Sequence, residues 1–251
     1  MATTARVRSV PSDLGPLDAV EDDVFVPWMT EYATWEVAEA TLLRRWLRPS
    51  MTFLDVGAHV GYFTLLAREC VGKRGTVIAI EPEPENYAVL VQNVRARHAR
   101  NVATVNAAAW SVPGRLGLAR SPRNSGDHRV RVDDSLAQVD AIVLDAVLPP
   151  TMRIDVVKID TQGTDHHVVR GLVSTLARWR PRLVVEFWPP AIADVDPATL
   201  PGEYRALGYH VAALEATLAA DAAGTEFVRA AADAEHEFLT LVLEPLPEAN
   251  S

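Results

Sequence analysis

The segment TFLDVGAHVGYFTLLA, residues 52–67, constrains the fold most, because an apolar strand pattern passes through a glycine turn into a helical pattern. Asp55 ends the strand pattern, and Gly57 and Gly61 lie in the turn. Glycine has no Cβ, so it permits both a tight turn and a close approach of the backbone to a ligand. The segment therefore predicts the first strand, turn and helix of a parallel α/β sheet, with a ligand at the carboxyl end of the strand. A plain strand-to-helix turn is the alternative.

Beyond this unit, strand-like and helix-like segments alternate along the chain. The strand patterns are almost wholly apolar, which predicts a parallel sheet covered on both faces. Near the end, 209–214 and 236–245 are predicted to form a closing strand pair. The other predicted strands are 75–82, 102–110, 155–160 and 182–187, and the predicted helices are 62–70, 84–97 and 166–179.

The chain is expected to form a single α/β domain with an N-terminal extension. Residues 1–24 are rich in turn-forming and acidic residues and are predicted to be a flexible or loosely docked arm. The domain is predicted to span 25–251, with a helical lid at 25–48 and a Rossmann-like core at 51–245.

Composition limits the classes of partner. The 251 residues are 49% apolar, enough for a substantial core, and the formal net charge of -9 lacks the basic footprint of a nucleic-acid-binding protein. Cys70 is the only cysteine, so an intrachain disulfide or a cysteine metal cluster is excluded. We find no signal peptide pattern and no apolar run long enough to span a bilayer, so we expect a cytoplasmic protein without a membrane partner. The oligomeric state is not fixed by the sequence, and a homodimer is left open.

An acidic residue after the second strand pattern narrows the ligand. Glu81 lies twenty positions after Gly61, where a carboxylate can accept hydrogen bonds from both hydroxyls of a ribose. The sequence does not match a nicotinamide-binding fingerprint, because Phe63 stands where that fingerprint has its last glycine. The Tyr-x-x-x-Lys pair of short-chain dehydrogenases and the Gly-Lys-Ser/Thr of a P-loop do not occur either. The D-x-G-x-x-x-G spacing of Asp55, Gly57 and Gly61 instead resembles the first motif of S-adenosylmethionine-dependent methyltransferases.

Five blocks in series extend this likeness over about residues 36–188. They resemble, in order, the successive blocks of the FkbM family of methyltransferases, and their serial order is more specific than any one block. The resemblance implies a class I methyltransferase fold, a seven-stranded Rossmann-like sheet with the last strand antiparallel. It also implies S-adenosyl-L-methionine as cofactor. The blocks are FLDVGAHVGYFTLLA, GTVIAIEPEPENYAVLVQNV, NVATVNAAAWSVPGRLGL, NSGDHRV and DVVKIDTQGTDHHVVRGL.

Two residues depart from the family pattern. His59 stands where the family usually has Asn, and its ring can still offer a nitrogen to the carboxylate of the cofactor. Gln162 stands where a glutamate is common, which removes a carboxylate and argues against a divalent metal there. We therefore assign no metal ligands, and a metal on Asp160, Asp165 and a histidine is the alternative.

Ten residues are predicted to bind the cofactor. Asp55 is expected to accept from the amino group of the methionine part, and Glu81 to bind the ribose. Small residues at 106–108 would leave space for adenine, or would only pack a helix on the sheet. The predicted set is Asp55, Gly57, His59, Gly61, Phe63, Glu81, Pro82, Asn106, Ala108 and Asp160.

Catalysis needs a group that aligns the acceptor and removes its proton. We predict His166 as the base, since the usual histidine pKa suits that task at neutral pH, with Asp160 as its orienter or as a cofactor contact. Asp127 and His128 are further candidates for the base. The alternative for His166 is a surface histidine near a helix N-terminus with no catalytic role.

Aromatic and acidic residues elsewhere are predicted to line the acceptor pocket. Trp188 is expected to form a wall and Glu36 to face the pocket. Trp28, Tyr32 and Trp35 recur at helical spacing and would close the pocket as a lid or belong to the core.

The sequence thus predicts an S-adenosylmethionine-dependent O-methyltransferase that acts on a hydroxyl of a small molecule, a sugar or a natural-product intermediate. The Ala-, Arg- and Val-rich composition associates it with tailoring of secondary metabolites, as in antibiotic biosynthesis. An N-methyltransferase and a non-catalytic cofactor-binding module are the alternatives.

Overall fold

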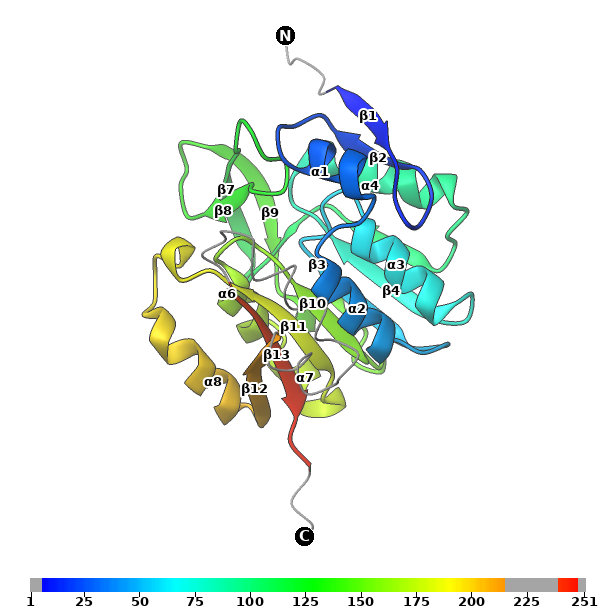
Figure 1. The fold of residues 1–251 in the computed structure, drawn as a ribbon. Helices are drawn as coiled ribbons and strands as arrows, with labels where there is room; N and C mark the ends of the chain where they lie inside the picture. The colour runs from blue at the N-terminus through cyan, green and yellow to red at the C-terminus, as the bar shows by residue number, and fades with distance from the viewer. Residues whose placement is uncertain (1–5, 215–238, 248–251) are drawn as a thin grey trace.

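A seven-stranded sheet forms the centre of the computed structural model, which describes residues 6–214 and 239–247 (Figure 1). Its strands are β3 (Thr52–Val56), β4 (Thr76–Ile80), β5 (Val102–Val105), β10 (Val156–Ile159), β11 (Arg182–Phe187), β12 (Tyr209–Ala213) and β13 (Leu239–Pro245). They lie in the order β12-β13-β11-β10-β3-β4-β5, and β13 is antiparallel to both of its neighbours while the other pairs are parallel. The predicted sheet, with its last strand antiparallel, is confirmed. Residues 236–238 of the predicted closing strand lie outside the described residues.

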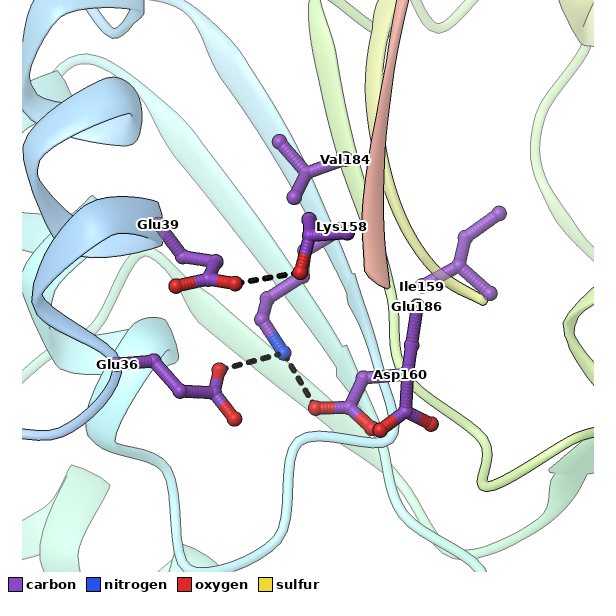
Figure 2. Close-up of a pocket in the computed structure, with 8 residues that line it drawn as sticks. Glu36, Glu39, Lys158, Ile159, Asp160, Val184 and Glu186 are labelled. Carbon is purple, nitrogen blue, oxygen red and sulfur yellow. Dashed lines mark hydrogen bonds and ion pairs between the residues drawn. The ribbon is translucent and has the colours of Figure 1, made fainter. Parts of the chain in front are cut away.

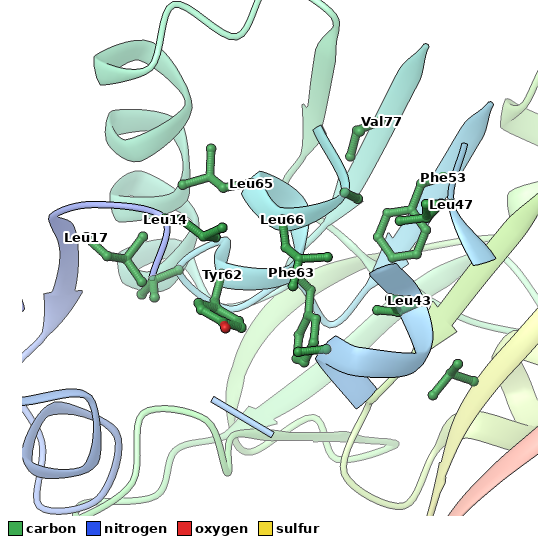
Figure 3. Close-up of a cluster of buried hydrophobic side chains, with 14 of the residues drawn as sticks. Leu14, Leu17, Leu43, Leu47, Phe53, Tyr62, Phe63, Leu65, Leu66 and Val77 are labelled. Carbon is green, nitrogen blue, oxygen red and sulfur yellow. The ribbon is translucent and has the colours of Figure 1, made fainter. Parts of the chain in front are cut away.

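Helices bury the two faces of this sheet in separate apolar layers. The helices are α2 (Val37–Trp46), α3 (Tyr62–Val71), α4 (Pro84–Ala96), α6 (Asp165–Arg170), α7 (Val173–Trp179) and α8 (Leu200–Ala206). Successive strand residues alternate between the layers because side chains on a strand point to opposite faces. Phe53 packs with α2 and α3 in one layer (Figure 3), whereas Leu54 packs with α6, α7 and α8 in the other. Lys158 of β10 therefore points into the layer of α2 and α3, the same face as Val156.

The N-terminal segment differs from the predicted flexible arm. Residues 7–20 form an antiparallel hairpin of β1 (Val7–Val10) and β2 (Leu17–Val20), and Leu17 is fully buried in the main core. Asn93 of α4 fixes β2, since its side chain accepts from the backbone N–H of Asp18 and donates to the Asp18 carbonyl, at 2.9 and 2.8 Å. The alternating apolar residues of this short strand supply the burial that a flexible arm would lack.

The predicted helical lid divides into two helices. The second, α2, buries Leu43 in the main core and so belongs to the body of the domain. The first, α1 (Phe25–Tyr32), carries Trp28 and Tyr32 on its exposed side. α1 also buries Phe25, Val26 and Met29 in the same core, so both helices pack into the body of the domain.

A second sheet of four strands was not predicted. It contains β6 (Ala108–Ala109), β7 (Gly114–Ala119), β8 (Arg129–Arg131) and β9 (Ala137–Ile142), and it is followed by the short helix α5 (Leu144–Val147). The single strand predicted at 102–110 therefore divides between two sheets. The predicted helix at 166–179 also divides, at Gly171, where a Cβ would lie 2.5 Å from the carbonyl oxygen of Trp110. Within the described residues, none of the helices combines the length and the hydrophobicity needed to cross a bilayer.

Candidate cofactor and acceptor site

The turn after β3 is packed closely against neighbouring segments of the chain. Gly57 has a φ of +81°, and a Cβ there would lie 1.8 Å from the carbonyl oxygen of Asp160 on the neighbouring strand. Gly61 has a φ of +94°, and its Cβ would lie 2.6 Å from Cδ1 of Leu90. Both glycines are needed for the backbone conformation and for packing. The turn brings the N-terminus of α3 to the carboxyl ends of the strands, where ligands bind in such sheets.

Asp55 lies at the end of β3 with an unsatisfied oxygen. Its side chain is 1% exposed, and Oδ2 accepts a 2.6 Å hydrogen bond from the hydroxyl of Thr64. Oδ1 has no hydrogen-bond partner among the residues that the structure describes. Burial raises the pKa of Asp55 to about 6, although the Lys158 charge opposes this. A buried acceptor without a donor is costly, so this oxygen fits a ligand that brings an ammonium group.

Glu81 follows β4 and is held by the backbone. Its carboxylate, 5% exposed, accepts from the backbone N–H groups of His59 at 2.8 Å and Glu83 at 2.9 Å. Burial raises the pKa of Glu81 to about 8, while these two donors lower it. Each oxygen has a second lone pair that a ribose hydroxyl could use. The amide of Asn106 donates to the carbonyls of Glu81 and Pro82, at 2.8 and 3.0 Å, so these three predicted residues do lie together.

The ring of His59 is enclosed by segments from elsewhere in the chain. Its Nε2 lies 2.8 Å from Oγ of Ser125, which donates to a carboxylate oxygen of Asp22 at 2.7 Å. The Phe25 ring of α1 meets the His59 ring edge-on, 4.9 Å between centroids. Burial lowers the pKa of His59 to about 4, against the nearby Asp22 charge, so the ring is neutral at pH 7. The predicted bond from His59 to the cofactor would therefore compete with Ser125.

A buried cluster of charges lies beside this turn (Figure 2). Lys158 is at its centre, with Nζ 2.7 Å from Oδ2 of Asp160 and 3.6 Å from Oε2 of Glu36. The ammonium also lies 4.5 Å from the centroid of the Phe63 ring. Glu39 is close by and accepts from the hydroxyl of Thr240 at 2.6 Å. The single ammonium group of Lys158 is thus shared by several carboxyl groups.

These carboxyl groups do not have the same affinity for a proton. Burial raises the pKa of Glu36 to about 8, although the Lys158 charge opposes the rise. Burial also disfavours ionisation of Asp160, but the charge and hydrogen bond of Lys158 lower its pKa below the usual value. For Lys158 itself, burial is outweighed by the charges of Asp160 and Glu36, so its pKa is raised. The cluster therefore contains a firmly ionised acid and an acid that titrates near neutral pH.

Gln162 joins two of the acids. Its side-chain nitrogen donates to Oδ1 of Asp160 at 2.8 Å and to Oε1 of Glu186 at 3.2 Å. Its backbone N–H donates to the other oxygen of Glu186, also at 3.2 Å. Burial raises the pKa of Glu186 well above its usual value, and the Asp160 charge adds to the rise. The amide of Gln162 thus stands where the family commonly has a carboxylate, and it donates hydrogen bonds to the surrounding acids.

The predicted catalytic pair of Asp160 and His166 is not brought together. The Asp160 side chain accepts hydrogen bonds from Lys158 and Gln162, whereas Nε2 of His166 lies 3.0 Å from Oδ1 of Asp194. The His166 side chain is fully buried, with an exposed fraction of 0%. A base must touch the acceptor, so this burial counts against the predicted role.

The competing candidates are engaged elsewhere. Asp127 pairs with Arg129 at 2.9 Å, and Nδ1 of His128 accepts from the backbone N–H of Ser121 at 3.0 Å. The guanidinium of Arg129 also lies over the predicted pocket wall Trp188, 4.3 Å from the ring centroid. Ala108 is buried in the apolar cluster of the four-stranded sheet, which favours packing over an adenine contact.

Sequence reasoning missed several residues of this site. Glu186 ends β11 just as Asp55 and Asp160 end or follow β3 and β10, so an acid at the carboxyl end of three adjacent strands was the available signal. Lys158 was visible as a charge inside an apolar strand. Ser125 lies in the block NSGDHRV, whereas Glu39 carries no such signal, because only the tertiary fold brings it to the site.

Together, the sheet order, the glycine turn, the unsatisfied Asp55 oxygen and the acid after β4 define a Rossmann-like S-adenosylmethionine-dependent methyltransferase domain of class I. More specifically, residues 55–211 match the family model described as the methyltransferase FkbM domain. This match covers more than half of the chain, which belongs to that family. The cofactor of this class is S-adenosyl-L-methionine.

Individual relatives are distant. A protein-L-isoaspartate O-methyltransferase from Caenorhabditis elegans is 34% identical over 73 residues, 29% of this chain and 32% of that protein. The chain spans a third or less of the length of this relative and of its Arabidopsis thaliana counterpart, for which the share is 24%. These matches cover only one part of the domain.

Solved structures resemble the fold. An FkbM methyltransferase from Methylobacillus flagellatus has a TM-score of 0.48 and 16% identity, over 69% of this chain and 46% of that one. A Clostridium thermocellum protein described as an rRNA methylase has a TM-score of 0.50 and 10% identity, over 84% of this chain and 95% of that one. TYW2 from M. jannaschii, solved in complex with AdoMet, has a TM-score of 0.48 and 14% identity, over 98% and 90% of the two chains. At these identities the likeness concerns the fold alone.

Proposed function

We propose that this domain methylates a hydroxyl group of a small molecule, such as a sugar or a natural-product intermediate. The observation that carries the proposal is the Glu36, Lys158 and Asp160 cluster beside the cofactor turn. A hydroxyl must lose its proton as it attacks, so an acceptor of this kind needs a base at hand. An amine is already nucleophilic and makes less use of one.

The residues of the turn fit the cofactor. Bound S-adenosylmethionine supplies an electrophilic methyl group on a sulfonium. The unsatisfied oxygen of Asp55 is placed to accept from an ammonium group, and the Glu81 carboxylate is placed to accept from hydroxyls. We retain Gly57 and Gly61 as residues that shape the turn, and Asn106 as the residue that orients the Glu81 and Pro82 backbone.

We assign the base to Glu36 rather than to His166. An efficient base has a pKa near the working pH, and burial raises the pKa of Glu36 to about 8. Its side chain is 22% exposed, so an acceptor can reach it. Asp160, ionised beside Lys158, would hold the acceptor hydroxyl by accepting a hydrogen bond before the proton leaves.

The test is methyl transfer by the purified protein to a panel of hydroxyl and amine acceptors, followed by mass spectrometry for the gain of one CH₂ group. We expect Glu36→Gln to lower kcat by about 100-fold or more, the usual contribution of a general base, with cofactor affinity unchanged. Exposed Glu69 provides the matched control, since Glu69→Gln should leave kcat unchanged. Methylation of amines alone, or full turnover by Glu36→Gln, would refute the O-methylation mechanism.

The proposal extends to the compartment and the partners. Because the chain contains one cysteine and has a net charge of -9, we propose a cytoplasmic enzyme without a nucleic-acid partner. The Ala-, Arg- and Val-rich composition supports a small-molecule acceptor from secondary metabolism. Cofactor binding without transfer to any acceptor in a metabolite extract would instead favour an accessory binding module.

A further inference from the structure

Three side chains converge on a point apart from the charged cluster described above. His166 and His167 lie on α6, which follows β10, and Asp194 lies in the segment that follows β11. One ligand atom from each of these residues lies within 4.8 Å of the other two. Two imidazole nitrogens and one carboxylate oxygen form a common set of three protein ligands for a transition metal.

The carboxylate of Asp194 faces both rings. Nε2 of His166 lies 3.0 Å from Oδ1, and Nε2 of His167 lies 2.8 Å from Oδ2. The two rings are 4.3 Å apart between centroids and tilted by 38°. Both Nε2 atoms therefore point to the same side, toward one carboxylate.

His167 is oriented by contacts on its other side. Its Nδ1 lies 2.9 Å from the hydroxyl of Ser111, and its ring stacks on Trp110 with 3.7 Å between centroids. Metal-binding histidines almost always use the second ring nitrogen in this way, because the contact fixes the ring and the tautomer. Ser111 gives His167 such a partner.

His166 lacks the hydrogen bonds that its burial demands. Its Nδ1 has no partner in the described part of the chain, and its Nε2 has only the 3.0 Å ion-pair contact with Asp194. Its side chain is fully buried, whereas that of Asp194 is 51% exposed. An unsatisfied buried imidazole beside an accessible carboxylate suits a cation that enters from solvent and keeps water in its open position.

We propose that His166, His167 and Asp194 bind a divalent transition cation of the zinc class. Two nitrogen ligands favour Zn²⁺ or Co²⁺ over Mg²⁺ and Ca²⁺, which take oxygen ligands. The bound cation ties α6 to the segment after β11, which carries Trp188 and Asp194. The site uses residues to which we assign no role in methyl transfer, so its test does not depend on turnover.

The test is isothermal calorimetry of the chelator-treated protein with ZnCl₂, and with MgCl₂ in parallel. We expect one Zn²⁺ per chain and no response to Mg²⁺. His167→Ala and Asp194→Asn should each weaken Zn²⁺ binding more than about tenfold, and Ser111→Ala by about tenfold, as is typical for residues that orient a ligand. We make no substitution of His166, because replacement of a fully buried side chain is expected to destabilise the fold. Instead, the visible absorption bands of bound Co²⁺, retained or lost in these variants, report the environment of the cation and of His166.

Exposed His210 on β12 provides the matched control for non-specific binding, and His210→Ala should leave the Zn²⁺ affinity unchanged. Circular dichroism of each variant checks that it is folded. The proposal is overturned if Zn²⁺ does not saturate one site. It is equally overturned if the folded His167→Ala and Asp194→Asn variants bind Zn²⁺ with the affinity of the parent protein. The contacts between the two rings and the carboxylate would then hold only a proton and no cation.

Discussion

Substitution of Gly57 by alanine separates the two reasons for a glycine in the turn after β3. A glycine needed only for ligand approach would leave the fold intact when replaced. The structure indicates otherwise, since the new Cβ would lie 1.8 Å from the carbonyl oxygen of Asp160. Real Cβ atoms do not approach that closely, so the turn and β10 must move apart.

The cost has two parts. A non-glycine residue at a φ of +81° loses about 1–2 kcal/mol from backbone strain. Relief of the clash shifts a backbone held by hydrogen bonds from Gly57 N to Ile80 O and from Asp160 N to Val56 O, both 2.9 Å. Overpacking of this kind costs about 1–3 kcal/mol. Gly57→Ala should therefore lower the free energy of unfolding by about 2–5 kcal/mol in urea titrations.

Other glycines provide the controls. Gly72 has a φ of +64° and nothing within 4 Å of a Cβ, so Gly72→Ala should show the strain alone. Gly114 also has open space around a Cβ and no positive φ, so Gly114→Ala should be nearly neutral. If Gly57→Ala is no less stable than Gly72→Ala and loses only cofactor affinity, the packing argument is refuted and the glycine serves the ligand.

Three further predictions concern the charged groups. Glu81→Ala should weaken S-adenosylmethionine binding by more than about tenfold in calorimetry, and an unchanged affinity would exclude the ribose contact. Lys158→Met should destabilise the fold by about 3–5 kcal/mol in urea titrations, because it leaves buried carboxylates unpaired, and a near-neutral effect would show that the ion pair is not needed. Raising the pH from about 6.5 to about 8.5 should lower the free energy of unfolding, because the native protein holds protons that the unfolded chain has released. Glu36, with its pKa raised from 4.5 to about 8, contributes to this slope, and Glu36→Gln should reduce it in urea titrations at each pH.

The parts of the fold that sequence could predict are those with a strong local pattern. Apolar runs such as the one within Arg182–Phe187 specify buried strands, and the turn residues Gly57 and Gly61 both have the positive φ that favours glycine. The hairpin of residues 7–20 could not be seen, because its stability comes from Leu17 in the core and from Asn93, far away in sequence. The four-stranded sheet was missed because β6 and β8 have only two and three residues and β7 lies in a stretch punctuated by glycine and proline.

The residues of the candidate site show the same difference between positions set by a local sequence pattern and positions set by tertiary packing. Residues fixed by a strand end, such as Asp55, Glu81 and Asp160, lie at the carboxyl edge of the sheet as predicted. The assignment of His166 depended on the direction of a side chain on a six-residue helix, which packing decides. Asp194 comes from an irregular segment whose position no periodicity encodes, so its approach to the histidines needed the structure.

Lys158 explains how acids of opposite behaviour coexist in one cluster. Its raised pKa keeps the ammonium charged throughout the working range, and its 2.7 Å contact keeps Asp160 ionised. Glu36 lies farther from the same nitrogen, at 3.6 Å, so the effect of burial outweighs the Lys158 charge and raises the pKa of Glu36 to about 8. Pairs of acids pushed apart in this way mark acid and base assignments. If Glu36 is the base, turnover must rise as the pH passes through about 8, while the same loss of a proton lowers the stability of the fold. One titration then links activity and stability with opposite signs, and Glu36→Gln must weaken both pH dependences at once.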